Sequence, residues 1–238
     1  MFNWFSKSPA KTNDGLLKIK ADFIEMLRAA QREFHIATDV ALCGVSADSA
    51  REEVLQKDKQ VNKAERNIRK GLVIHCSVRG SITPESLVMM SIAKDAERLG
   101  DYAKNIFDLG ALPLAAPCGD DKERLLILKK LIEQVFADCI AIIRDQSEEA
   151  ATKLIRDAAW ISRQCENNTV RLLQLETPNN RTAADVLMYR YMKRVVLHLR
   201  NICSSIVQPV HKLDFTSKLT KDLDVSGDLL DRSVPTEE

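Results

Sequence analysis

Apolar residues recur every three or four positions over long stretches of the chain. One such run near the N-terminus comprises Ile19, Phe23, Leu27, Ala30, Phe34, Ala37 and Ala41. A run of the same spacing in the second half comprises Leu125, Leu128, Ile132, Val135, Cys139 and Ile142. Steps of three and four place side chains on one face of an α-helix, so both runs predict amphipathic helices that pack against a core.

Proline and capping residues predict where the helices begin and end. Proline is absent from 10–83, 118–177 and 179–208, which leaves room for long helices. Thr83 before Pro84 is a typical helix start, because threonine caps free N–H groups and proline fits the first turn. Thr182 and Asp185 resemble a capping box at the start of the last helix. The expected helices cover about 16–41, 49–78, 84–109, 120–145, 147–175 and 182–207.

The second half of the chain repeats the order of parts found in the first. At an offset near 96, the residues Thr83, Arg98, Asn105 and Ile106 fall on Thr182, Arg194, Asn201 and Ile202. Asp58 falls on Asp157 at an offset of 99. We therefore predict an all-α fold of two tandem, pseudo-symmetric three-helix bundles that form an elongated body.

The repeat predicts four divisions of the chain. The first repeat covers 13–112 and the second covers 119–212. The N-terminal segment 1–12 opens with aromatic residues, and we expect it to dock on the protein's own flank rather than on a membrane surface. The acidic C-terminal tail 213–238 has little periodicity and is expected to be mobile or to form a short docked helix.

Composition restricts the class of function. The chain has 35 Lys and Arg against 34 Asp and Glu, spread along the helices, so no bulk field attracts nucleic acid or an anionic membrane. The six cysteines occur singly and mostly within apolar helical pattern, which disfavours a disulfide scaffold or zinc site and fits a reducing cytosol. No stretch approaches the ~20 apolar residues that cross a bilayer, so at most peripheral membrane contact is expected.

Acidic residues gather on the second and third predicted helices. On the second helix, steps of four, three and four join Asp58, Asn62, Glu65 and Arg69. On the third, Glu97 and Asp101 lie four residues apart. If these faces meet, three or four carboxylates converge, which is the arrangement that hard or borderline cations require. The alternative is a solvated face whose charges pair locally, Asp95 with Arg98 and Asp101 with Lys104.

No pattern typical of an enzyme is present. Carboxylate-bridged di-iron bundles need a Glu three residues before a His, and none of His35, His75, His198 or His211 has one. His75 is expected to be a core or boundary residue rather than a ligand. The sequence also lacks a nucleophile–base arrangement, a Walker loop, a dinucleotide fingerprint and a zinc motif. We therefore predict a non-enzymatic protein.

Two segments resemble the phosphate-uptake regulator (PhoU) family. Residues 58–65 read DKQVNKAE, and residues 96–106 read AERLGDYAKNI. The likeness extends over about 12–212 and includes the doubled three-helix layout. It implies a cytosolic regulator of phosphate transport that acts on the phosphate-specific ABC transporter and on a sensor histidine kinase. It also implies that Glu/Asp-x-x-x-Asp pairs on helices two and three could bind iron, zinc or similar ions.

The chain departs from the family pattern at several acidic positions. Arg69 stands where the motif of helix two would place its closing Asp. In the second half, Lys193 and Leu197 replace the acidic pair, and Gln164 replaces Glu65. We therefore expect no second metal site. At the first, Arg69 could reach Glu97 or Asp101, so an internal salt-bridge network or a single weakly held divalent or iron-type cation is favoured over a multinuclear cluster.

The candidate residues form two groups. The tentative metal ligands are Asp58, Glu65, Glu97 and Asp101. The residues expected to shape the structure or a partner face are Asn62, Arg69, Arg98, Asn105, Arg194 and Asn201.

The resemblance leads to one interpretation of function and two alternatives. We predict a cytoplasmic adaptor that binds a phosphate-transporter component or a sensor histidine kinase by helix-face recognition, with no nucleic-acid partner. The alternatives are a metal-binding helical protein for iron or zinc storage or redox, and a regulatory module of a sodium-dependent phosphate carrier. A homodimer is compatible with residual apolar helix faces.

Overall fold

The computed structural model describes residues 14–223 and 227–231 of the 238-residue chain. Its helices are α1 (Asp14–Leu42), α2 (Ala47–Arg79), α3 (Pro84–Gly110), α4 (Gly119–Asp145), α5 (Glu148–Leu173) and α6 (Asn180–Val207). Two short 3₁₀ helices follow, η1 (Val210–Lys212) and η2 (Leu229–Asp231). The predicted all-α class is confirmed, and the N-terminal segment 1–12 lies outside the described residues.

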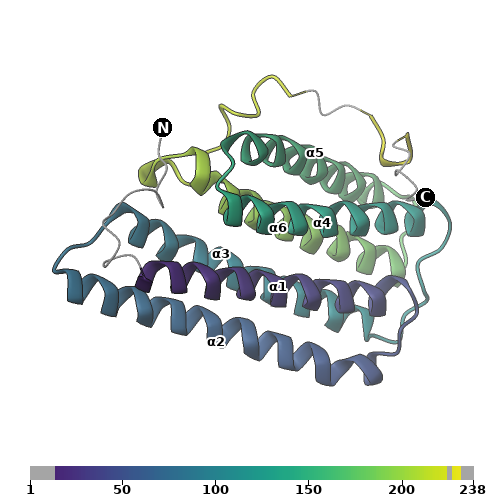
Figure 1. Ribbon diagram of the computed structural model, residues 1–238. Coiled ribbons are helices and arrows are strands. Elements are labelled where there is room, and N and C mark those ends of the chain that lie inside the picture. The colour runs from purple at the N-terminus through teal and green to yellow at the C-terminus, as the bar shows by residue number, and fades with distance from the viewer. Residues whose placement is uncertain (1–13, 224–226, 232–238) are drawn as a thin grey trace, which may run out of the picture.

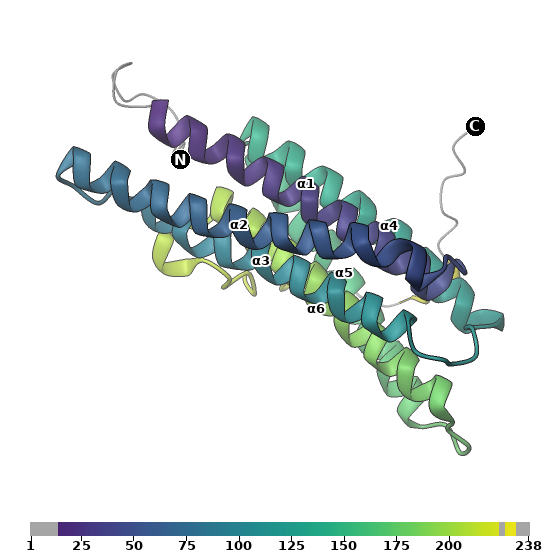
Figure 2. The same cartoon turned by 90° about the horizontal axis from the view of Figure 1, so that it is seen from below.

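The six long helices form two three-helix bundles that lie side by side along their length. Helices α1, α2 and α3 pack on one another, and so do α4, α5 and α6 (Figure 1). The bundles meet where α3 packs on α6 and α1 packs on α4, so each of these helices contacts its own counterpart in the other half. The view from below shows the resulting elongated body (Figure 2).

Buried aromatic and apolar side chains follow the predicted helical faces. Phe23, Leu27 and Phe34 of α1 are fully buried. The ring centroids of Phe34 and Phe136 lie 5.6 Å apart, so the α1 and α4 faces share one core across the bundle boundary. A polar cluster flanks this contact, in which Lys129 Nζ of α4 lies 2.6 Å from Asp39 Oδ1 of α1. The apolar pattern therefore positions both bundles and the joint between them.

The start of α6 differs from the predicted capping box. The N-cap is Asn179, whose side chain accepts a hydrogen bond of 3.0 Å from the Thr182 backbone N–H, while the Thr182 hydroxyl accepts from the Asn179 N–H. Thr182 is thus the third helical residue, and Asp185 pairs with Arg181 instead. Asn179 lies 96 residues after the α3 cap Thr83, the same offset that joins Arg98 to Arg194.

All six cysteines are free thiols. Cys139, Cys165 and Cys203 are buried as the apolar pattern predicts. Cys43 and Cys118 are exposed, because both lie in connections just outside helices α1 and α4. Among the residues that the structure describes, no helix combines the length and apolar character that a bilayer span requires.

Part of the C-terminal tail packs against the second bundle. Leu229 of η2 is fully buried, and Arg124 of α4 forms an ion pair with Asp228. The Gln164 side chain of α5 donates a 2.9 Å hydrogen bond to the carbonyl of Gly227. The expectation of a short docked helix is met at 229–231, where the helix is of the 3₁₀ type.

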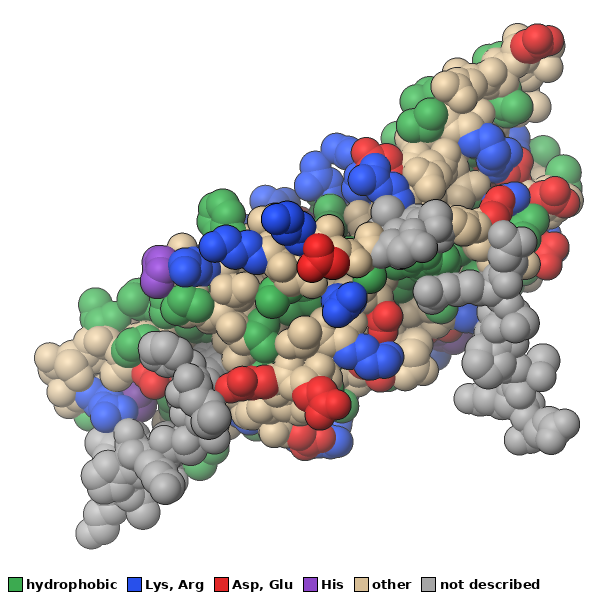
Figure 3. Space-filling model, turned by 90° about the horizontal axis from the view of Figure 1, so that it is seen from above, with side chains coloured by type: hydrophobic (Ala, Val, Ile, Leu, Met, Phe, Trp, Pro, Cys, Tyr) green, Lys and Arg blue, Asp and Glu red, His purple; other side chains and the backbone are tan. Residues whose placement is uncertain are grey.

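The surface on the side of the second bundle carries charges of both signs. Figure 3 shows Lys and Arg interspersed with Asp and Glu along this face, with apolar side chains between them. This mixture agrees with a net charge of +1 and offers no single-sign field on the face shown.

Candidate functional site

The central contact of the predicted site joins helices α2 and α3 through one lysine. Lys94 Nζ lies 2.7 Å from Glu97 Oε2 and 3.9 Å from Glu65 Oε1. Both glutamate side chains are almost completely buried. The structure therefore brings Glu65 and Glu97 together, as the sequence predicts, and places a cation between them. Lys94 was missed, although its position three residues before Glu97 is a signal for an intrahelical ion pair.

Arg69 makes its ion pair within its own helix. Its Nη2 atom lies 3.0 Å from Glu65 Oε1, four residues earlier on α2. The prediction that Arg69 reaches Glu97 or Asp101 is therefore replaced by a pairing with Glu65, because the i, i+4 neighbour is the nearer carboxylate. Two cationic side chains, Arg69 and Lys94, thus compensate the buried charge of Glu65.

The local pairs expected for a solvated face also differ on α3. Arg98 Nη1 lies 3.0 Å from Asp101 Oδ2, whereas the expected partner of Arg98 was Asp95. Asp95 instead faces α6, where the side chains of His198 and Asn201 contact it. Burial, and next the negative charge of Glu97, raise the pKa of Asp101 above its usual range, while Arg98 opposes this.

A buried carboxyl group that the sequence analysis missed lies beneath this cluster. Glu33 of α1 is fully buried, and neither of its carboxyl oxygens has a hydrogen-bond partner. It packs against Gly100 of α3, where a Cβ atom would lie 3.2 Å from Glu33 Oε2. Gly100 therefore allows α3 to approach α1 closely at this carboxyl group.

The environment of Glu33 keeps its carboxyl group protonated at neutral pH. Burial is the main cause that raises its pKa to about 9, and the negative charges of Asp58 and Asp101 add to the effect. Lys104 opposes it. Asp58 itself accepts a 3.3 Å hydrogen bond from Asn62 Nδ2 on the same helix. Asp58 is thus placed near Glu33, while Asp101 is close enough to interact with both Glu33 and the Lys94–Glu97 pair.

The sequence did contain a signal for Glu33. A second buried stripe on α1 comprises Met26, Ala29, Glu33, Ile36 and Val40, with steps of three and four. The predicted core face of this helix is the neighbouring stripe through Phe23 and Phe34. Since a central helix of a bundle can be buried on two sides, an acidic residue in the second stripe is a buried carboxyl candidate.

The donor set does not fit a bound metal as it stands. Cationic side chains already occupy the space between the carboxylates, since Lys94 contacts both Glu65 and Glu97 and Arg98 contacts Asp101. Within the described part of the chain, no three His, Cys, Asp or Glu side chains are grouped so that they could hold an ion. A cation at Asp58, Glu65, Glu97 and Asp101 would have to displace these ion pairs.

The equivalent positions in the second bundle make different contacts. Gln164, which replaces Glu65, binds the tail through the Gly227 carbonyl. Lys193 Nζ lies 3.4 Å from Glu166 Oε2 of α5. Asn201 Nδ2 donates to Asp95 across the bundle boundary, whereas Arg194 of α6 and Asn105 of α3 are half-buried. Asn201 therefore contributes to the contact between the bundles, while Gln164 and Lys193 make contacts within the second half.

Removing the bridging charge should weaken the α2–α3 contact and expose its carboxylates to added cations. We expect Lys94→Met to lower the free energy of unfolding by about 1 kcal/mol, because Lys94 is partly exposed and its ion pairs are screened. Zn²⁺ or Mn²⁺ should then raise the Tm of the variant more than that of the parent. Urea and thermal unfolding followed by circular dichroism measure both effects.

The matched control for this prediction is Lys153→Met. Lys153 also forms an ion pair within one helix, with Asp157 Oδ2 at 2.9 Å, but it is far more exposed than Lys94. Its replacement should change stability by less than about 0.5 kcal/mol. Equal metal-induced shifts in the parent and in Lys94→Met would contradict the role assigned to Lys94.

Comparison with known proteins identifies relatives at the level of sequence and fold. The model of the PhoU domain matches residues 23–109, the part of the chain that contains Glu33 and the α2–α3 cluster. The phosphate-specific transport system accessory protein PhoU homolog of Xylella fastidiosa (strain 9a5c) is 24% identical over 226 residues, which is 88% of this chain and 94% of that protein.

Two solved structures share the fold. PhoU from Pseudomonas aeruginosa superposes with a TM-score of 0.71 at 15% identity and covers 83% of this chain and 97% of its own. The phosphate transport system regulatory protein PhoU from Streptococcus pneumoniae superposes with a TM-score of 0.64 at 16% identity. That superposition covers 89% of this chain and 99% of the pneumococcal chain. The arrangement of six helices is therefore one that these proteins have in common.

Proposed function

We propose that this chain is a member of the PhoU family and regulates a phosphate transport system by binding one of its protein components. The observation that carries the proposal is the extent of the match, because the Xylella accessory protein aligns with both bundles and not with the first alone. The pneumococcal structure carries the description of a regulatory protein. The two descriptions thus name an accessory protein and a regulatory protein of phosphate transport systems.

The proposed mechanism is recognition by a rigid helical surface. The contacts of Lys94 with Glu65 and Glu97 join α2 to α3, so they would hold the two helices in a fixed register without a metal ion. A partner that contacts residues on both helices can bind only if the two helices keep that register. The partner classes proposed are a component of a phosphate transporter or a sensor histidine kinase, met in the cytoplasm.

Cross-linking in cells tests the proposal directly. The full chain, tagged at its chromosomal locus, would be cross-linked in cells grown with and without phosphate, and the captured membrane-associated proteins identified by mass spectrometry. We expect to capture a subunit of an ATP-driven phosphate transporter or a sensor kinase. The captured amount should differ between cells grown with and without phosphate. Capture of only a sodium-dependent phosphate carrier would assign the chain to the carrier-module alternative.

Two surface variants connect the captured protein to the α2–α3 register. Lys94→Met should reduce the amount of partner recovered, while Lys153→Met on α5 should recover as much as the parent chain. Equal recovery with both variants would contradict the proposed role of the α2–α3 cluster, whichever partner is found. A deletion strain whose phosphate uptake responds normally to starvation would overturn the regulatory function itself.

A further inference from the structure

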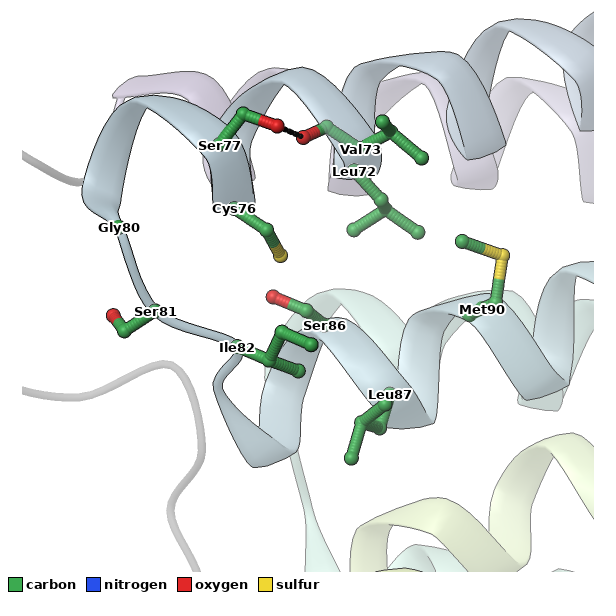
Figure 4. A pocket seen from close by; sticks show the side chains of 10 residues that line it. All are labelled: Leu72, Val73, Cys76, Ser77, Gly80, Ser81, Ile82, Ser86, Leu87 and Met90. Carbon is green, nitrogen blue, oxygen red and sulfur yellow. Dashed lines mark hydrogen bonds between the residues drawn. The ribbon is translucent and has the colours of Figure 1, made fainter.

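An apolar groove lies between α2 and α3 at the end of the first bundle. It has a volume of about 520 Å³. Its apolar lining comprises Leu72, Val73, Cys76, Ile82, Leu87 and Met90. Figure 4 shows Leu72 and Cys76 pointing from α2 toward α3, and Met90 pointing from α3 back toward α2. The groove is thus a hollow between two helices rather than a flat surface.

Several large apolar side chains around this groove are uncovered. Val73 is 59% exposed and Ile82 is 70% exposed, and Leu87 is also an exposed large residue. Contiguous exposed apolar surface that is concave and has a serine rim is typical of a docking site. Ser77, Ser81 and Ser86 supply that rim. Burial of this surface by an apolar occupant would therefore be favourable.

The sequence that precedes α1 contains a suitable apolar segment. The first five residues are Met1-Phe2-Asn3-Trp4-Phe5, three of them aromatic in a chain that is 5% aromatic. Aromatic rings supply large apolar area at a small cost in side-chain entropy, and a methionine such as Met90 makes favourable contacts with them. These residues precede the described part of the chain.

The start of α1 lies at the same end of the bundle as the groove. A Cβ atom on Gly15 would lie 3.1 Å from Nδ1 of His75, and His75 is the neighbour of the groove residue Cys76. Eight residues (6–13) lie between Phe5 and Asp14, and the nine Cα-to-Cα steps of an extended chain span up to about 30 Å. Since a helix is about 10 Å across, a segment of this length can pass around α2 to the groove.

We propose that the aromatic residues Phe2, Trp4 and Phe5 dock in the apolar groove between α2 and α3 and cover this end of the first bundle. The short connection keeps the segment at a high effective concentration, which favours docking within one chain over association between chains. The segment then acts as a tethered cap on surface that would otherwise be exposed to solvent.

A second groove, on the other side of α2, is the alternative position for the segment. It lies between α1 and α2, and its lining includes Lys18, Asp22, Asn67, Lys70 and Arg79. Aromatic rings would leave these charged and amide groups without water, so this groove is the poorer host. Adjacent residues on α2 distinguish the two grooves, because Val73 lines the apolar groove and Ile74 lines the charged one.

Fluorescence of Trp4 tests the proposal. The chain has two tryptophans, Trp4 and the buried Trp160, so subtracting the spectrum of a Trp4→Phe variant isolates the signal of Trp4. We expect blue-shifted emission from Trp4 and weak quenching by acrylamide in the full chain. Val73→Asp should shift the emission to the red and raise quenching severalfold. Val73 is exposed, so Val73→Asp should not unfold the chain, which circular dichroism verifies.

The matched control is Ile74→Asp, which changes an adjacent residue of similar exposure, 52% against 59% for Val73. It should leave the emission and quenching of Trp4 unchanged. Emission typical of free tryptophan in the parent chain would overturn the proposal, and so would an equal response to both substitutions. A blue shift that appears only on raising the protein concentration would assign the groove to a second copy, and one that requires anionic lipid vesicles would assign the segment to a membrane.

Cys76 offers a second readout that does not depend on tryptophan. Its thiol lies in the groove, while Cys43 and Cys118 are exposed elsewhere and serve as internal controls. Replacing Phe2, Trp4 and Phe5 together by Ser should raise the alkylation rate of Cys76 severalfold, measured peptide by peptide by mass spectrometry. The rates of Cys43 and Cys118 should not change. An unchanged rate at Cys76 would contradict docking in this groove.

Discussion

Replacing Glu33 with Gln is expected to remove a pH-dependent loss of stability of about 4 kcal/mol between pH 5 and pH 8. The pKa of this buried carboxyl group is about 9 in the folded chain, against an ordinary value of 4.5. Between these values the folded chain keeps the proton and the unfolded chain has released it. The free energy of unfolding therefore falls as the pH rises from about 4.5 toward 9, by about 1.4 kcal/mol per unit.

Urea unfolding at several pH values measures this contribution as the difference between the parent and Glu33→Gln. Glutamine has nearly the shape of the protonated carboxyl group and does not titrate, so the slope attributed to Glu33 should be absent in the variant. Glu25→Gln is the matched control, because Glu25 lies on the same helix and is exposed. It should keep the slope of the parent. A parallel pH profile for Glu33→Gln would show that Glu33 is ionised in the folded chain.

The helices and the doubled layout could be predicted from the sequence because they depend on local rules. Apolar spacing, the proline positions and the Thr83-Pro84 start each act within a few residues. The same rules are wrong at the start of α6, where they predict Thr182 as the cap and the structure has Asn179. Asn179 competes as an N-cap only three residues earlier, and the choice depends on where the helix fits against its bundle.

The candidate site was predictable in part. The approach of Glu65 to Glu97 follows from two helix faces meeting, which a bundle model implies. The position of Lys94 between them does not follow from the sequence, because the long, flexible side chain of a lysine can reach any of several carboxylates. Glu33 was missed for a different reason, since the helix that carries it has two buried faces and only one was considered.

Contacts between the bundles depend on a packing that no local pattern specifies. Asp95 and His198 are 103 residues apart, and their meeting requires α3 to pack on α6 in one register. In the sequence, Asp95 stands three residues before Arg98, so a local ion pair was the natural expectation. The structure uses Asp95 to connect the two halves of the repeat, and its replacement should have a large effect.

Asp95→Ala is expected to lower the free energy of unfolding by about 3 kcal/mol, because it leaves buried hydrogen-bond donors without an acceptor. Oδ1 of Asp95 lies 2.7 Å from Nδ1 of His198 and accepts a 3.3 Å hydrogen bond from Asn201 Nδ2. The His198 ring also stacks on Tyr102 of α3, with ring centroids 5.7 Å apart, so the ring cannot turn away freely toward water. Asp95→Asn keeps an acceptor oxygen, so it should lower the free energy of unfolding by less than Asp95→Ala does.

A double-mutant cycle with His198→Phe separates the pair from the rest of the interface. Phenylalanine keeps the stacked ring and removes Nδ1, so Asp95→Ala should cost at least about 1 kcal/mol less in the His198→Phe background than in the parent. Asp108→Ala is the control, since Asp108 lies on the same helix and is exposed, and it should change stability by less than about 0.5 kcal/mol. Additive losses at Asp95 and His198 would mean that the hydrogen bond between α3 and α6 contributes nothing to the joint. A coupling of the expected size would instead make this pair one of the contacts that fix how the two halves of the repeat are joined.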